Sequence, residues 1–173
     1  MPENKNLQAA LMYASYGWAV FPLRPKDKRP LSLHGFHDAT IDPVQIQKWW
    51  DAMPDAGIGI ATGSASGLVV LDMDPRNEGT HSLAAIQAQY GEWQPTPEML
   101  TGGGGKHFYF KLPSDKGILP SAKPWPGIDI KAEGGYVAAC PSIHPSGIMY
   151  RWVKGREPDS VELQPTPDWL VTL

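Results

Sequence analysis

Short apolar runs, each closed within a few residues by glycine, proline or serine, set the pattern of this 173-residue sequence. The clearest are GIGIA at 57–61 and GLVVLDMD at 67–74, and runs of this length and composition are typical of buried strands. The 18 glycines and 18 prolines are spread between such runs rather than gathered in one tract. The elements must therefore be short and joined by tight turns, which predicts a turn-rich globular fold.

Helical periodicity is confined to a few segments. The first has small and apolar residues at helical spacing, followed by a terminating glycine: Leu7, Ala10, Leu11, Ala14 and Gly17. A second helix is predicted from Asp42 as the cap and Pro43 at the first helical position, with Gln45 completing a capping box and Pro54 ending it. A third helix is predicted around residues 80–90.

Strands account for most of the remaining pattern. Besides the two runs above, apolar or alternating segments predict strands at 18–23, 99–101, 107–112, 128–131, 136–139 and 148–153. Helices first and a sheet meander after them predict an α+β fold with a mixed or antiparallel sheet. We find no internal repeat or linker, so residues 1–173 are predicted to form a single domain. A further helix is predicted to open at Thr166, which suggests that the intact protein continues with a helical region or a helicase.

Composition narrows the setting in which the protein works. Cys140 is the only cysteine, so no disulfide can form within the chain, and zinc sites of the usual cysteine spacing are excluded. The polar N-terminus does not resemble a signal peptide and no segment is apolar enough to span a membrane, so we expect a cytoplasmic protein with no membrane partner. The net charge of −3 does not favour non-specific nucleic-acid binding, although basic residues gather at 24–30.

Two acidic residues close the run GLVVLDMD. Because side chains alternate along a strand, Asp72 and Asp74 are predicted to point to one face with α-carbons about 6.5 to 7 Å apart, while Met73 points into the core. Such a pair can hold divalent cations, and oxygen ligands suit Mg²⁺ or Mn²⁺. Two ions about 3.5 to 4 Å apart serve in-line displacement at phosphorus. The alternative is a solvent-exposed acidic turn, which the pair alone does not exclude.

A glycine-rich segment, TGGGGKHFYFKLP, leads into another predicted strand. The residues 102–105 carry no side chains, so their backbone amides can come within hydrogen-bonding range of a phosphate. We expect Gly105 and Lys106 at a bound nucleotide, together with His107, whose imidazole is placed to donate to a triphosphate oxygen. On its own, the glycine run would be a flexible loop and the histidine a structural one.

The segment GIDIKAEGGY adds a third acid. Asp129 and Lys131 share one face of a predicted strand, and Ile128 and Ile130 share the other. Three carboxylates gathered without a metal would repel one another by roughly 2 kcal/mol per pair at about 7 Å and an effective dielectric constant near ~20. Bound cations would remove that cost, so the third acid favours a metal site.

The order of these segments resembles one known family. It is carried by GWAVFPL, PKDKRP, GFHDAT, IQKWW, GIGIATG, SGLVVLDMD, TGGGGKHFYF and GIDIKAEGGYVAACPSIHPSG. They closely resemble, in sequence order, the bifunctional primase-polymerase N-terminal family of the archaeo-eukaryotic primase superfamily, from about Leu7 to Trp152. The resemblance implies a primase-polymerase catalytic fold, with a sheet that bears the site on an open face and an N-terminal α/β unit packed beside it.

The resemblance also implies a role for each candidate residue. Asp72 and Asp74 match the paired metal-binding acids and Asp129 the third, which implies a catalytic site with two Mg²⁺ or Mn²⁺ ions. His107 matches the histidine that contacts the phosphates of the incoming nucleotide. Lys28 and Lys131 match basic positions, expected at the triphosphate or template. The implied partners are single-stranded DNA template, a primer or initiating nucleotide, nucleoside triphosphates and, in plasmid or phage replication, a helicase.

The sequence departs from the family pattern at one motif. Cys140 and Pro141 stand where the family has two prolines, which leaves the roles of Ser142 and His144 open. The cysteine and histidine set of a zinc-bearing insertion found in some relatives is absent. Trp125, between prolines, is a candidate for stacking on a base, whereas three other histidines are interpreted as structural or solvated: His34, His37 and His81.

Two rival functions stay open beside template-directed nucleotidyl transfer. The first is a replication-initiator domain of the same fold, which binds DNA or nucleotide without turnover. The second is a metal-dependent nuclease that uses the same three acids. The glycine-rich turn with His107 favours a triphosphate over a phosphodiester as the substrate.

Overall fold

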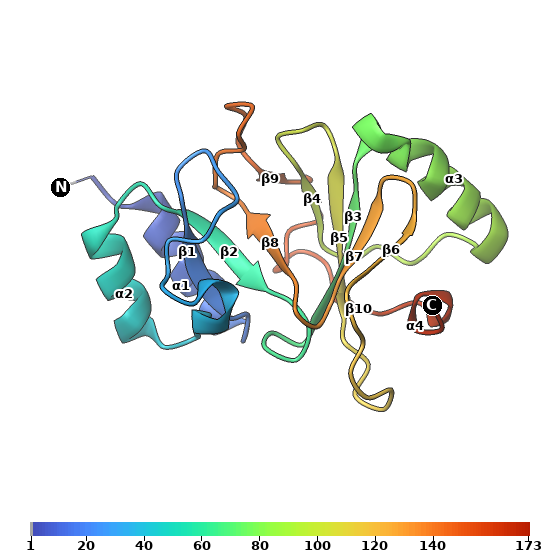
Figure 1. Cartoon of the computed structure of the whole chain (residues 1–173), viewed down its shortest axis with the longest axis horizontal. Coiled ribbons are helices and arrows are strands. Elements are labelled where there is room, and N and C mark those ends of the chain that lie inside the picture. The colour runs from blue at the N-terminus through green and yellow to red at the C-terminus, as the bar shows by residue number, and fades with distance from the viewer. Residues whose placement is uncertain (1) are drawn as a thin grey trace.

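The computed structural model describes residues 2–173, which form two β-sheets lying side by side (Figure 1). The smaller sheet is antiparallel, with β2 (Gly57–Ala61) between β1 (Val20–Leu23) and β8 (Tyr136–Ala139). Helices α1 (Lys5–Ser15) and α2 (Pro43–Ala52) pack against it, and a 3₁₀ helix (Gly35–Asp38) lies in the connection between β1 and α2. This is the N-terminal α/β unit that was expected.

The larger sheet has the order β6-β7-β3-β5-β4-β9, and β10 pairs with β5. Its pairs along that order are antiparallel, whereas β10 runs parallel to β5. The strands are β3 (Leu68–Met73), β4 (Glu98–Leu100), β5 (Lys106–Lys111), β6 (Ala122–Trp125), β7 (Ile128–Lys131), β9 (Arg151–Trp152) and β10 (Gln164–Pro165). Helices α3 (Gly79–Tyr90) and α4 (Asp168–Val171) contribute to the core on one of its faces. An α+β fold with a mixed sheet is thereby confirmed.

The expected meander breaks at β8, which pairs with β2 in the smaller sheet instead of following β7 in the larger one. The chain therefore crosses between the sheets three times, from β2 to β3, from β7 to β8 and from β8 to β9. The first two crossings are joined by hydrogen bonds, because Thr62 donates through its amide to Gly135 O at 3.0 Å and through its hydroxyl to Ala132 O at 2.7 Å. This contact fixes the two sheets against each other.

The helix boundaries follow local capping chemistry. Asn4 caps α1 by accepting from the amides of Asn6 and Leu7, and Asp42 caps α2 by accepting from Val44 at 3.0 Å. The capping box expected from Gln45 is replaced, because the amide of Asp42 donates to Thr40 Oγ1 at 3.1 Å. A 3₁₀ turn (Pro75–Asn77) precedes α3, and Gly91 ends that helix with a φ of 85°.

The C-terminal elements and the weaker strands differ in detail from expectation. Helix α4 begins at Asp168, because the hydroxyl of Thr166 donates to Lys111 O at 2.8 Å and ties this segment to the sheet. The strand expected at 148–153 is reduced to β9 and a single bridge between Ile143 and Met149. Strand β6 escaped prediction because it contains Pro124, which cannot donate a ladder hydrogen bond.

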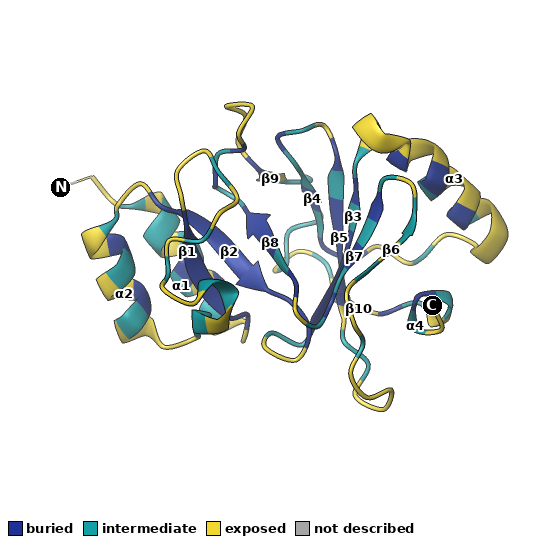
Figure 2. Cartoon of the chain, viewed as in Figure 1, coloured by how far each residue is buried: buried dark blue, intermediate teal, exposed yellow. Residues whose placement is uncertain are grey.

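Side-chain alternation on β3 divides the core between the two faces of the larger sheet. Val69, Leu71 and Met73 pack on the face toward α3 and α4, as expected for Met73. Leu68 and Val70 pack on the other face together with the smaller-sheet unit. Figure 2 shows that the strands are largely buried and that the outward sides of α2 and α3 are exposed. Asp72 continues the row of Leu68 and Val70, but its side chain remains 25% exposed.

No helix within residues 2–173 combines the length and the apolar character that crossing a bilayer requires.

Candidate functional site

Strand register places three predicted site residues in one row across the larger sheet. Asp72 of β3 pairs with Asp129 of β7 on one side and with His107 of β5 on the other. Residues directly opposite one another in a sheet project from the same face, so the two acids and the histidine are neighbours. Asp74 follows β3 with extended backbone angles and lines the same cavity as Asp72 and Asp129. The structure thus brings the three predicted acids and His107 together.

The Asp72 carboxylate lies against His107, with Nε2 of the imidazole 3.5 Å from Oδ1. Burial acts to raise the pKa of Asp72, but His107, Lys28 and Lys131 outweigh burial and hold that pKa below its ordinary value. The His107 side chain is 5% exposed, and its Nδ1 has no hydrogen-bond partner within residues 2–173. A buried polar atom without a partner is uncommon in proteins.

Asp74 is held by the residues that follow it. Arg76 donates to Oδ1 from Nε at 3.0 Å and to Oδ2 from Nη2 at 3.1 Å, and its backbone amide donates to Oδ1 at 3.0 Å. Asn77 Nδ2 donates to Oδ2 at 3.0 Å. The side-chain hydrogen bond from Arg76 is the main reason that the pKa of Asp74 lies below its ordinary value. The carboxylate is therefore ionised and fully hydrogen-bonded.

Asp129 is paired with two lysines. Nζ of Lys131, on the same strand, lies 3.3 Å from Oδ2, and Nζ of Lys123, on β6, lies 3.5 Å from the same oxygen. The repulsion expected among the three acids is therefore offset by cations of the protein itself. The sequence pattern predicts bound metal alone in that role, because it does not show that each acid has a basic or imidazole side chain within reach.

The acids fit a divalent cation by their chemistry and position. Asp72 and Asp129 stand opposite each other on adjacent strands, Asp74 lines the same cavity, and all three offer the carboxylate oxygens that Mg²⁺ and Mn²⁺ prefer. In their present orientations, no three His, Cys, Asp or Glu side chains of the described chain are grouped closely enough to ligate one ion. An ion at this face would replace Arg76 and the two lysines as the partner of Asp74 and Asp129.

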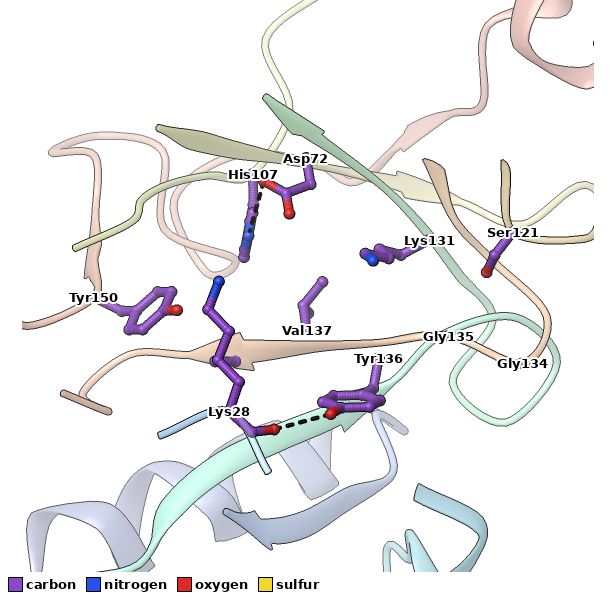
Figure 3. A pocket seen from close by; sticks show the side chains of 11 residues that line it. Lys28, Asp72, His107, Ser121, Lys131, Gly134, Gly135, Tyr136, Val137 and Tyr150 are labelled. Atoms are coloured by element: carbon purple, nitrogen blue, oxygen red, sulfur yellow. Dashed lines mark hydrogen bonds and ion pairs between the residues drawn. The ribbon is translucent and has the colours of Figure 1, made fainter. Parts of the chain in front are cut away.

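Two cavities meet at Asp72. One, of about 280 Å³, lies between the sheets and is lined from both sides, as Figure 3 shows. The other, of about 600 Å³, extends over β6 and β7, and its lining includes the remaining two acids, Lys123 and Trp125. Lys28, Asp72 and Lys131 line both cavities. A ligand that enters either cavity therefore meets Asp72 and two basic side chains.

Lys28 comes to the site from the side of the smaller sheet. It lies in the loop between β1 and α2, where its carbonyl oxygen accepts a hydrogen bond from the Tyr136 hydroxyl at 2.9 Å. Figure 3 shows its side chain extending from there toward His107. Lys131 reaches the same cavity from β7. The two lysines that the sequence singled out are thus both brought to Asp72.

Two of the expected nucleotide-binding residues are placed differently. Lys106 lies on the opposite face of β5 from His107, pairs with Glu98 at 2.7 Å, and lines a separate cavity beside Phe108. Neighbouring residues of a strand cannot share a face, so Lys106 is directed away from the acids.

Gly105 has a structural role in the hairpin between β4 and β5. Its amide donates to Thr101 Oγ1 at 3.0 Å and is not free for a phosphate. A Cβ built on Gly105 would lie 2.2 Å from Met73 O, so only glycine allows the hairpin to approach β3 this closely.

Sequence reasoning missed several residues of the site. Tyr136 and Tyr150 line the smaller cavity, yet tyrosines between apolar residues are read from sequence as core. Arg76 could have been suspected, because Asp-Pro two residues before it signals a tight turn that folds the chain back on Asp74. Trp125 lines the larger cavity, as its predicted stacking role requires, and packs edge-on against Trp169 with ring centroids 5.6 Å apart.

Comparison with known proteins places the chain in one family. The chain has no significant match among curated proteins. The sequence profile of the family described as bifunctional DNA primase/polymerase, N-terminal, matches residues 10–169, a span that includes every site residue described above. This match covers nearly the whole chain, and the chain therefore belongs to the bifunctional DNA primase/polymerase N-terminal family, with a function of the DNA primase/polymerase type.

Proposed function

We propose that the chain transfers nucleotides from nucleoside triphosphates to the 3′-hydroxyl of a primer on a single-stranded DNA template, with Mg²⁺ or Mn²⁺ held by Asp72, Asp74 and Asp129. The observation that carries the proposal is the row Asp129–Asp72–His107 beside a cavity lined by Lys28 and Lys131. Family membership supports the class of reaction. The row supports the choice of these three residues as the site of that reaction.

Each residue has a role that its surroundings allow. When bound, divalent ions would polarise the phosphates and activate the attacking hydroxyl. Lys28 and Lys131 reach the cavity from opposite sides and can neutralise the charge of a triphosphate held between the sheets. His107 lines the smaller cavity, where its imidazole can donate to a phosphate oxygen. Holding both reactants in one cleft lowers the entropic part of the barrier.

A binding-only domain is the second candidate function, and one observation favours it. Asp74 and Asp129 are already paired with Arg76, Lys123 and Lys131. A domain that recognises DNA or nucleotide without turnover would need no metal to exchange with those cations. A nuclease, like a polymerase, would need a metal ion to take the place of those cations at the acids.

The test is an end-labelled primer annealed to a longer template and incubated with nucleoside triphosphates and Mn²⁺. We expect the wild-type chain to extend the primer, and Asp72→Asn or Asp129→Asn to reduce extension by about a hundredfold or more. Asp115→Asn is the control, because Asp115 is exposed in the loop between β5 and β6. Shortened primers would indicate a nuclease, and retention of unchanged primer would indicate a binding domain.

A further inference from the structure

Lys28 reaches the cavity between the sheets from an exposed turn at residues 24–29. The turn closes on itself, because Asp27 Oδ1 accepts from the amides of Lys28 at 2.7 Å and Arg29 at 3.0 Å. In the described part of the chain, a single hydrogen bond joins this turn to another segment, and its donor is the Tyr136 hydroxyl, 2.9 Å from Lys28 O. Tyr136 is therefore the polar contact that fixes the turn beside the cavity.

The Tyr136 hydroxyl is itself held in place. Tyr136 is the first residue of β8, and its ring packs edge-on against Phe21 of β1, with centroids 5.2 Å apart. The same ring stacks with Phe36 of the 3₁₀ helix at 6.0 Å. Burial raises the pKa of Tyr136, so the phenol stays protonated and remains a donor at neutral pH. The turn is thus tied to a fixed donor of the smaller-sheet unit.

The Lys28 side chain needs this support, because a lysine ammonium sits on a long and flexible stem. Figure 3 shows the side chain extending from the turn toward His107, and Lys28 lines both cavities that meet at Asp72. Among the residues that the structure describes, no carboxylate forms an ion pair with its ammonium. The position of the Lys28 backbone therefore decides whether its charge reaches the cavity.

We infer that Tyr136 is a positioning residue, which holds the Lys28 backbone so that the Lys28 ammonium lies at the cavity beside Asp72. It acts by pre-organisation, since a lysine that already stands at the cavity loses less conformational freedom when a ligand binds. The identity of that ligand, a nucleoside triphosphate, rests on the proposed function. Tyr136 also lines the smaller cavity, so the experiment must separate this role from direct contact with the ligand.

Tyr136→Phe tests the inference because it removes only the hydroxyl. In the ligand-free protein, ¹⁵N relaxation should show greater mobility of the amides at 26–29 than in the wild type. Affinity for dATP, titrated with Mg²⁺ and without primer or template, should fall about two- to tenfold, as expected for one hydrogen bond. Lys28→Ala should lower the affinity as well, and the double variant should bind no more weakly than Lys28→Ala alone. Tyr90→Phe, which removes a hydroxyl from the exposed side of α3, should match the wild type in both measurements.

The outcomes separate this inference from the proposed function. Wild-type mobility of the turn in Tyr136→Phe would overturn the inference, and so would unchanged dATP affinity if Lys28→Ala weakens binding. A double variant weaker than Lys28→Ala by the full factor of Tyr136→Phe would also overturn it, because the hydroxyl would then act independently of Lys28. If Lys28→Ala binds dATP as the wild type does, the phosphate contact of the proposed function is wrong, whereas a more mobile turn in Tyr136→Phe still supports the inference. Melting temperatures near that of the wild type show that the variants are folded.

Discussion

Each acid of the candidate site is neutralised by a cation or an imidazole of the protein itself. Asp72 is the most enclosed of them, and its low pKa shows that His107, Lys28 and Lys131 favour the ionised carboxylate more strongly than burial opposes it. Replacing this acid by asparagine therefore removes a favourable interaction instead of relieving repulsion. The folded chain should lose stability as a result, which reverses the expectation drawn from three unpaired acids.

The direction of the Asp72 pKa shift determines how the stability loss of Asp72→Asn depends on pH. A pKa lowered by folding adds stability above the unfolded-state pKa of about 3.9, and this stability disappears as the pH falls through the folded-state pKa. We expect the free energy of unfolding of Asp72→Asn to fall below that of the wild type at pH 7, and the difference to shrink toward pH 3. Urea unfolding in EDTA at both pH values measures it. If the difference in unfolding free energy stays constant or grows on acidification, folding does not lower the pKa of Asp72.

Residue patterns predicted which side chains share a face, but not which of them touch. Alternation correctly placed Asp72, Asp129 and His107 together, because the strand period is two and the flanking apolar residues fix the buried face. The position of Lys106 beside the glycines predicts a nucleotide contact, but the same alternation directs its side chain to the opposite face. The contact of Arg76 with Asp74 depends on rotamers after a turn, which no periodic pattern specifies.

The first two crossings between the sheets, from β2 to β3 and from β7 to β8, position the elements that carry the site. Gly63 lies in the first crossing and Glu133 in the second, where the Glu133 carboxylate accepts from the Ser64 amide at 2.9 Å and from its hydroxyl at 2.8 Å. These hydrogen bonds, the one from the amide foremost, hold the pKa of Glu133 below its ordinary value. Strands β3 and β7, with their acids, leave from these crossings, so the crossings set where the acids stand.

Glycine substitutions test how closely the crossings pack. Gly63 has a φ of 74°, and a Cβ there would lie 2.6 Å from Glu133 Cα, whereas Gly67 has a φ of 65° and nothing within 4 Å. Gly67→Ala should cost about 1 kcal/mol of unfolding free energy for the left-handed backbone alone. Gly63→Ala should cost clearly more, because backbone atoms must also move. Urea denaturation compares the two variants, and equal losses would show that the crossings are not in firm contact.

Local pattern predicted most elements but not all of their partners. The bounds of β2, β7 and β8 agree with the predicted strands, because each is a short run marked by glycine. The pairing of β8 with β2 joins segments about eighty residues apart, and such pairing depends on packing between sheets rather than on the local sequence. The cavity between the sheets, with Tyr136 and Tyr150 in its lining, also depends on this packing, so the local sequence does not predict it.

The whole molecule works as two units that meet over one cleft. The larger sheet carries the acids and His107, while the smaller-sheet side contributes Lys28 and Tyr136. The chain has a net charge of −3, so its general surface gives phosphates little attraction. Any attraction must come from the basic side chains gathered at the cleft: Lys28, Arg76, Lys123 and Lys131. Affinity for nucleotide and template should accordingly depend on a few identifiable cations.

Lys28 offers the sharpest test, because it alone of these cations reaches the acids from the smaller-sheet side. If its ammonium neutralises a bound phosphate, Lys28→Ala should weaken the binding of a nucleoside triphosphate or of oligothymidylate. It should also reduce the slope of log affinity against log salt by about 0.7 for the single strand, since one fewer counterion is released. Titrations at several salt concentrations measure the slope. Lys48→Ala, which removes the same charge from the exposed side of α2, should leave affinity and slope unchanged. Equal behaviour of the two variants would mean that Lys28 is an ordinary solvated lysine and that the cleft binds phosphates from the larger sheet alone.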